Sequence, residues 1–288
     1  MLPVPARPPE PTAPAGLSGG PGDGDPLALY WDFYWAVAEA QLAEWLPARP
    51  ARVLDVSGGA GRSAAQAATA GHTVIEVLEP GPPAPPGPPA PHAPHVPQPP
   101  HAPQDRPGPH ARNGHRGRPP GQVHRVIADS GTLGFLADGC VDAVIAENRA
   151  LSRQLVTEAA VGEIARVLRP GGRLLLSVDS LTLGMALLAE RNYWAHLSDV
   201  PAAEVLLIPW PDGTITRCFG GDQLRELLVD AGLDVEWVRP RTVLSPSTVE
   251  HLLKRSPGTL EPLVRTELTA PVGDDSLGVQ LLASARRS

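Results

Sequence analysis

The glycine-rich segment at residues 55–61, which reads DVSGGAG, has the clearest chemical meaning in the sequence. It follows the apolar run ARVLDV and precedes the alanine-rich run RSAAQAATA, so it is expected to join a buried strand to a helix. A turn of this kind lets the backbone approach a ligand closely, and the free N–H groups of the first helical turn can bind it. Asp55 at the strand end adds a negative charge, which suits a cationic ligand such as an amino-acid ammonium group better than a phosphate.

The same loop also fits a second cofactor. Gly59, Gly61 and Ala64 match the G-x-G-x-x-A variant of the nicotinamide-dinucleotide fingerprint. A tight turn without any ligand is a third interpretation. The loop alone leaves these three interpretations open.

Glu79 is the next residue with a chemical role to consider. It follows the run TVIEVL at residues 73–78, which is expected to form the second strand. A carboxylate at that strand end can accept hydrogen bonds from both hydroxyls of a ribose. The strict offset from the glycine loop favours Leu78 for this role, and a solvated glutamate is the competing interpretation of Glu79.

The elements that must position these residues read as one α/β domain. An amphipathic helix over residues 27–46 precedes a strand–loop–helix–strand unit, which is expected to be parallel and right-handed. Further strands are expected at HRVIADS, VDAVIAE, RLLLSV, LDVEWVRP and GVQLLASAR, with a hairpin in VLLIPWPDGTITRCF. Helices are expected over 156–168, 181–197, 222–231, 247–255 and 260–268.

Two segments rich in proline and glycine interrupt this pattern. Residues 1–26 are expected to be a disordered tail, and residues 80–121 a disordered or polyproline-like insertion into a domain spanning 27–288. The histidines of the insertion are interpreted as incidental to a low-complexity tract rather than as metal ligands. Residues 181–220 are expected to form a cap over the substrate pocket.

Composition restricts the partners and the compartment. The net charge of −7 argues against a nucleic-acid-binding surface. No run approaches the roughly 18 apolar residues of a membrane-spanning helix. The two cysteines, Cys140 and Cys218, lack metal-ligand spacing and are expected to be free thiols in a reducing cytoplasm. These features together predict a soluble, cytoplasmic protein.

Four segments in order then resemble one known family. VLDVSGGAG, IADSGTLGFLADGCVDAVIAE, EIARVLRPGGRLLLSV and FGGDQLRELLVDAGLDVEWV are similar to successive motifs of class I S-adenosylmethionine-dependent methyltransferases, over about residues 50–240. The resemblance implies a Rossmann-like fold with a seven-stranded, mostly parallel sheet and helices on both faces. It implies S-adenosylmethionine as the cofactor, and the R-P-G-G signature is not expected in a nicotinamide dehydrogenase.

The resemblance also implies roles for single residues around the cofactor. Asp55, Ser57, Gly59 and Gly61 would surround its methionine part, and Glu79 would hold its ribose. Ser57 stands where the family has a glycine, so its Cβ and hydroxyl are expected to crowd the cofactor.

Other matched positions would contact the remaining parts of the ligand. Asp129 and Ser130 would meet the adenine amino group, because a carboxylate accepts N–H bonds. Glu147 and Asn148 would face the methionine end or the substrate. His196, in the stretch where such enzymes build the substrate pocket, is the candidate general base.

A helix of the family fold is replaced by the insertion at 80–121. This would leave apolar sheet surface bare and invite a protein partner or self-association. The sequence therefore predicts methyl transfer from S-adenosylmethionine to an unidentified small molecule. The alternatives are a catalytically degenerate scaffold of the same fold and, with less support, an NAD(P)-binding oxidoreductase.

Overall fold

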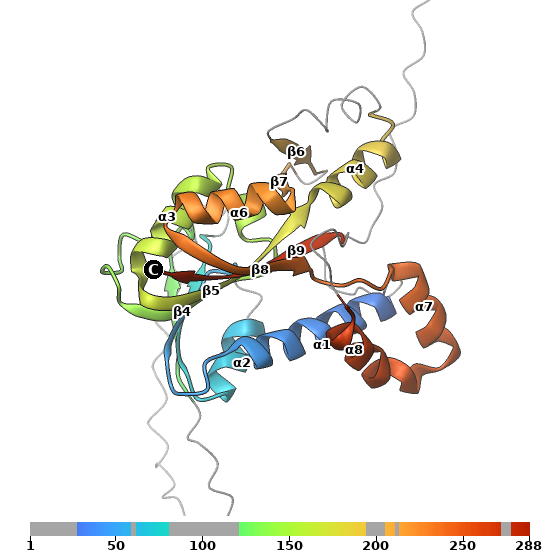
Figure 1. Cartoon of the computed structure of the whole chain (residues 1–288), viewed down its shortest axis with the longest axis horizontal. Coiled ribbons are helices and arrows are strands. Elements are labelled where there is room, and N and C mark those ends of the chain that lie inside the picture. The colour runs from blue at the N-terminus through green and yellow to red at the C-terminus, as the bar shows by residue number, and fades with distance from the viewer. Residues whose placement is uncertain (1–27, 59–61, 81–120, 194–204, 211–212, 272–277) are drawn as a thin grey trace, which may run out of the picture.

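A computed structural model describes residues 28–58, 62–80, 121–193, 205–210, 213–271 and 278–288 (Figure 1). These residues form a mixed α/β domain in which helices cover both faces of a large sheet. The expected tail at 1–26 and nearly all of the insertion at 80–121 lie outside the described residues. So do Gly59, Gly61 and His196, whose assignments remain predictions.

Within the described residues the sheet has nine strands, β1 to β9. Their bounds are Arg52–Asp55, Thr73–Leu78, Val123–Ile127, Val141–Ala146, Leu168–Ser180, Leu206–Pro209, Ile215–Phe219, Leu233–Pro240 and Gln280–Arg287. A path β3-β2-β1-β4-β5-β9-β8 contains the seven strands expected from the sequence, with β9 antiparallel to both neighbours. The expected hairpin, β6 and β7, joins this path through parallel pairing of β7 with the end of β5.

Alternation along the central strands divides the core into two layers. Val53 packs with the residues beneath α1 (Ala28–Trp45) and α2 (Arg62–Thr69), whereas Leu54 belongs to the core on the opposite face. Successive side chains of a strand point to opposite faces, so a fully buried strand is apolar on both. The second layer is covered by α3 (Thr157–Val167) and α6 (Gly221–Asp230), and Figure 1 shows these pairs of helices on opposite sides of the sheet.

Two helices between β8 and β9 pack against α1. These are α7 (Pro246–Arg255) and α8 (Leu260–Thr269), joined by the short helix η3 (Pro257–Thr259). Val249 and Leu253 of α7 pack with the aromatic stripe of α1, in which Tyr30, Phe33 and Tyr34 are buried. Most of that stripe therefore serves packing.

Strand β5 differs from expectation in its length. It begins at Leu168 rather than Arg173, because Leu168 pairs with Val141 ahead of a register shift between β4 and β5. Gly171 lies within the shifted segment with φ of 74°, a left-handed conformation that glycine adopts without the cost of a Cβ. The expected R-P-G-G turn is thus incorporated into the strand.

Strand β3 forms one edge of the sheet, and its described residues are partly to fully exposed. Strand β3 pairs with β2, and its last residue, Ile127, is 74% exposed. Residues 81–120, which occupy the place of a helix of the family fold between β2 and β3, lie outside the described residues. At the opposite edge of the sheet, α4 (Leu181–Glu190) packs with the β6–β7 hairpin in a separate apolar cluster that includes Cys218.

Both cysteines are free thiols, as expected. Burial raises the pKa of the Cys218 thiol to about 12. No helix in the described ranges is long and apolar enough to cross a membrane.

Candidate functional site

The carboxyl ends of β1, β2, β3 and β4 meet at one edge of the sheet, because the four strands are parallel neighbours. Each end carries a carboxylate singled out from the sequence. Asp55 ends β1, Glu79 follows β2, Asp129 lies two residues beyond β3, and Glu147 follows β4. Strand β1 has β2 as its neighbour on one side and β4 on the other, so the strand order reverses at β1. Ligands of open α/β sheets bind at such a topological switch point.

Asp55 is buried, and its two oxygens have different partners. Oδ1 accepts the Ser57 N–H at 2.9 Å, and Oδ2 accepts the Ser63 hydroxyl at 2.6 Å. Burial raises the pKa of the Asp55 carboxyl, although these hydrogen bonds oppose the shift. Asp55 therefore shapes the turn after β1 and anchors Ser63 in the first turn of α2.

Ser57 connects the ends of β1 and β4. Its Oγ accepts the backbone N–H of Glu147 at 3.0 Å, and its carbonyl oxygen accepts the Asn148 side-chain amide at 3.4 Å. Ser57 itself is buried. The residue that departs from the family pattern thus joins two of the segments predicted to contact the cofactor.

Glu79 and Ser130, predicted to hold the ribose and the adenine, lie against each other. Glu79 Oε1 accepts both the N–H of Ser130, at 3.2 Å, and the Ser130 hydroxyl. The amide of Gln154 donates to the same hydroxyl at 3.0 Å. Glu79 remains exposed at the end of β2, so the carboxylate is oriented by Ser130 and still reaches solvent.

Asp129 instead closes its own turn. Its Oδ1 accepts the Gly131 N–H at 2.8 Å, and its Oδ2 accepts the Thr132 hydroxyl at 3.3 Å. Such local bonding is typical of aspartate in turns. Asp129 is exposed, and its contact with adenine remains a prediction.

A buried arginine that sequence reasoning missed holds Glu147. Arg241, just after β8, donates from Nη2 to Glu147 Oε1 at 2.5 Å and from Nη1 to Gln41 Oε1 at 3.0 Å. Gln41 returns a bond from Nε2 to the Arg241 carbonyl at 3.2 Å. This network ties β4, β8 and α1 together beneath the candidate site.

The backbone just after Glu147 is left-handed at two non-glycine residues. Asn148 has φ of 53° and Arg149 φ of 61°. Such conformations are costly for residues with a Cβ and cluster at functional sites. Arg149 is held by a forked pair with Asp179, with Nε–Oδ1 and Nη2–Oδ2 distances of 2.8 Å each, and its guanidinium lies over the Trp210 ring.

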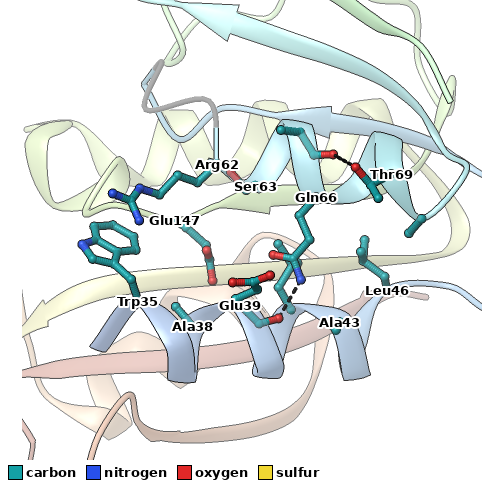
Figure 2. A pocket seen from close by; sticks show the side chains of 13 residues that line it. Trp35, Ala38, Glu39, Ala43, Leu46, Arg62, Ser63, Gln66, Thr69 and Glu147 are labelled. Atoms are coloured by element: carbon teal, nitrogen blue, oxygen red, sulfur yellow. Dashed lines mark hydrogen bonds between the residues drawn. The ribbon is translucent and has the colours of Figure 1, made fainter. Parts of the chain in front are cut away.

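A groove of about 560 Å³ runs between α1 and α2 and reaches Glu147 (Figure 2). Figure 2 shows Trp35 and Arg62 at one end, where the guanidinium carbon lies 4.7 Å from the ring centroid. Ser63, the partner of Asp55, also lines the groove. The groove therefore opens onto residues that border the edge of the sheet where the four strands end.

A small cavity of about 40 Å³ lies between α1 and the segment after β4, lined among others by Tyr30, Trp31, Tyr34 and Arg149. Burial raises the pKa of Tyr34 to about 12, so its hydroxyl stays protonated and donates to Gln280. The aromatic residues of α1 thus border this edge as well as packing against α7.

Gly58 is the glycine of this loop that the structure describes, and its backbone conformation favours glycine. Its φ is 80°, and an added Cβ would lie 2.7 Å from Nη2 of Arg153. Arg153 comes from the short helix η1 (Leu151–Arg153), which follows β4. The guanidinium of Arg153 therefore lies over the loop that follows β1.

Comparisons with known proteins agree with this arrangement. Residues 107–176 match the family model described as a methyltransferase domain; the first part of this match lies outside the described residues. None of the curated proteins searched matches the chain.

Among solved structures, a geranyl diphosphate methyltransferase in complex with GPP and sinefungin aligns with a TM-score of 0.50 and 15% identity, over 93% of this chain and 85% of that one. A 1,6-didemethyltoxoflavin-N1-methyltransferase from Burkholderia thailandensis aligns at 0.49 and 20% identity, over 90% and 81%. A methyltransferase from Methanosarcina mazei aligns at 0.49 and 13% identity, over 86% and 96%.

The match over residues 107–176 and the Rossmann-like fold support the class I methyltransferase domain that the sequence motifs predicted. S-adenosylmethionine is the cofactor of that class. The donor set at the sheet edge fits it: carboxylates suit the ammonium group and the ribose hydroxyls, and the N–H groups at the start of α2 suit the carboxylate.

Proposed function

We propose that the protein transfers a methyl group from S-adenosylmethionine to a small-molecule acceptor. The observation that carries this proposal is the meeting of Asp55, Glu79 and Glu147 at the carboxyl edge of three parallel neighbouring strands. Asp55 and Glu147 would face the methionine part, and Glu79, oriented by Ser130, the ribose. The acceptor would bind beside Arg149, Tyr34 and the groove between α1 and α2.

When bound, S-adenosylmethionine would supply an electrophilic methyl group, which would pass to the acceptor as the C–S bond breaks and S-adenosylhomocysteine is left. The chain's contribution is chiefly to position the two reactants and exclude water. A general base is needed only when the acceptor carries a proton at working pH. His196 remains the candidate for that role.

The exposed end of β3 supports a secondary proposal from the sequence. Exposure of Ile127 at the end of β3 fits contact with a protein partner or a second copy.

Calorimetric titration tests the function. We expect S-adenosylhomocysteine to bind the wild-type protein, and Asp55→Ala to abolish binding while the variant remains folded by circular dichroism. Binding of NAD with no binding of S-adenosylhomocysteine would indicate an oxidoreductase. Absence of binding by both ligands would favour the scaffold interpretation.

A further inference from the structure

We propose that the hydroxyl of Ser57 is a positioning group that holds the cofactor-binding ends of β1 and β4 in register. This inference rests on the proposed function and deepens it. It reverses the expectation that a serine at this position only crowds the cofactor. Ser57 acts through Glu147 and Asn148 rather than by touching the reacting atoms.

The argument begins with the pairing of β1 and β4. Their ladder runs to Asp55 opposite Ile145, and the Val56 N–H donates to the Ile145 carbonyl at 2.9 Å. One residue later the ladder stops. The next bond between the two segments is made by a side chain, with Ser57 Oγ accepting the Glu147 N–H at 3.0 Å.

The Ser57 hydroxyl therefore continues the pairing beyond the point where the backbones diverge. Glycine at position 57 would leave the N–H of Glu147 without this acceptor in a buried place. A buried donor without a partner is costly, so the segment would shift to find another. The Asn148 amide, which donates to the Ser57 carbonyl, would shift with it.

The segment after β4 needs such a restraint. Asn148 and Arg149 both have left-handed φ values, and conformations of that kind persist only where the surroundings fix them. The Glu147 side chain is fixed from the other direction by Arg241 at 2.5 Å. Ser57 supplies the restraint on the Glu147 backbone, and Arg241 supplies the restraint on its carboxylate.

Three substitutions separate positioning from crowding. Ser57→Ala keeps the Cβ and removes the hydroxyl, Ser57→Gly removes both, and Ser57→Thr keeps the hydroxyl. Ser177→Ala is the matched control, because Ser177 is a fully buried serine of β5 whose Oγ has no hydrogen-bond partner among the described residues. Titration with S-adenosylhomocysteine and amide hydrogen exchange at Glu147 are measured for each.

Positioning predicts that Ala and Gly weaken S-adenosylhomocysteine binding by about tenfold or more, the size of one buried hydrogen bond. Exchange of the Glu147 amide should accelerate in the same two variants. Thr should restore both values to near wild type, and Ser177→Ala should change neither. A purely structural role would lower the unfolding midpoint and leave the affinity of the folded protein unchanged.

Two further results would overturn the proposal while leaving the proposed function intact. One is tighter binding by Ser57→Gly with wild-type binding by Ser57→Ala, which is the signature of crowding. The other is unchanged exchange at Glu147 in both variants. Failure of the wild-type protein to bind S-adenosylhomocysteine would overturn the proposed function and this inference together.

Discussion

Arg241 and Glu147 form a buried ion pair, with Nη2 and Oε1 2.5 Å apart, between the residue after β8 and the residue after β4. The two side chains are 1% and 8% exposed. Burying a lone carboxylate at this depth would be costly, and the guanidinium offsets that cost. The pair also brings Gln41 of α1 to the same point, so the helix predicted to border the ligand is attached to the sheet beneath it.

Replacement of Arg241 should therefore destabilise the fold. Arg241→Met leaves Glu147 buried without its cation, and we expect the free energy of unfolding to fall by about 3–5 kcal/mol. Urea denaturation monitored by circular dichroism measures the change. The double variant Arg241→Met/Glu147→Gln should recover part of the loss, and a double variant no more stable than Arg241→Met would contradict this account.

A surface pair provides the comparison. Arg265 and Glu261 lie 2.8 Å apart on α8, but their side chains are 73% and 84% exposed. Arg265→Met should change the free energy of unfolding by less than about 0.5 kcal/mol, because exposed pairs contribute little.

Asp55 should make stability depend on pH. Because burial raises the pKa of its carboxyl, the folded protein binds this proton more tightly than the unfolded chain does. Ionisation of Asp55 therefore costs stability as pH rises from its ordinary pKa, about 3.9, through the folded-state value. Asp55→Asn removes that cost and can keep the bonds to Ser57 and Ser63.

We accordingly expect Asp55→Asn to equal or exceed the wild type in stability at pH 7, with the difference vanishing as pH falls towards 4. Binding of S-adenosylhomocysteine should be lost in the same variant. Denaturation series between pH 4 and 8 measure this. A variant that is less stable at pH 7 and becomes relatively more stable on acidification would show the opposite sign.

Glu79 should affect affinity and leave stability unchanged. Glu79→Gln retains an oxygen for Ser130 but removes the charge that would receive the ribose hydroxyls. We expect S-adenosylhomocysteine to bind about 10- to 100-fold more weakly, as for loss of hydrogen bonds to a charged group. The control is Glu226→Gln, an exposed change on α6 outside the site. Equal affinities of the two variants for S-adenosylhomocysteine would show that Glu79 does not bind the cofactor.

Gly184 tests whether the α4 and β6–β7 unit is packed as described. A Cβ there would lie 2.5 Å from Leu206 Cδ2 and 3.0 Å from Cys218 Sγ. Overpacking costs about 1–3 kcal/mol, which should outweigh the helix propensity gained by Gly184→Ala. Thermal unfolding should show a lower midpoint.

Gly162 in α3 is the matched site, since a Cβ there meets nothing within 4 Å. Gly162→Ala should raise stability by about 0.5–1 kcal/mol. If both substitutions stabilised the protein, the close packing of α4 against β6 and β7 described above would be contradicted.

The sequence predicted the elements better than their connections. Strand β8 has the bounds expected from the run LDVEWVRP, because alternation and flanking turns define a strand locally. The docking of α7 and α8 on α1 could not be predicted, since it depends on contacts between segments about 200 residues apart, such as the Tyr30 N–H to Glu250 bond, with a separation of 220 residues.

In the candidate site, too, local features were predicted and long-range contacts were missed. The strand-end carboxylates were predicted because they follow recognisable runs. Arg241 was missed because it lies in the run VRPRTV, which matches no motif. The sequence alone does not distinguish a buried arginine from an exposed one. The bond from Glu147 to Ser57 was missed because it joins residues 90 positions apart.

A co-crystal structure with S-adenosylhomocysteine tests the central claim most directly. We predict the ligand at the carboxyl ends of β1, β2 and β4, with its ribose hydroxyls bonded to Glu79 and its amino-acid end beside Asp55 and Glu147. A ligand bound elsewhere on the domain, or bound at this edge with its ribose away from Glu79, would contradict the account.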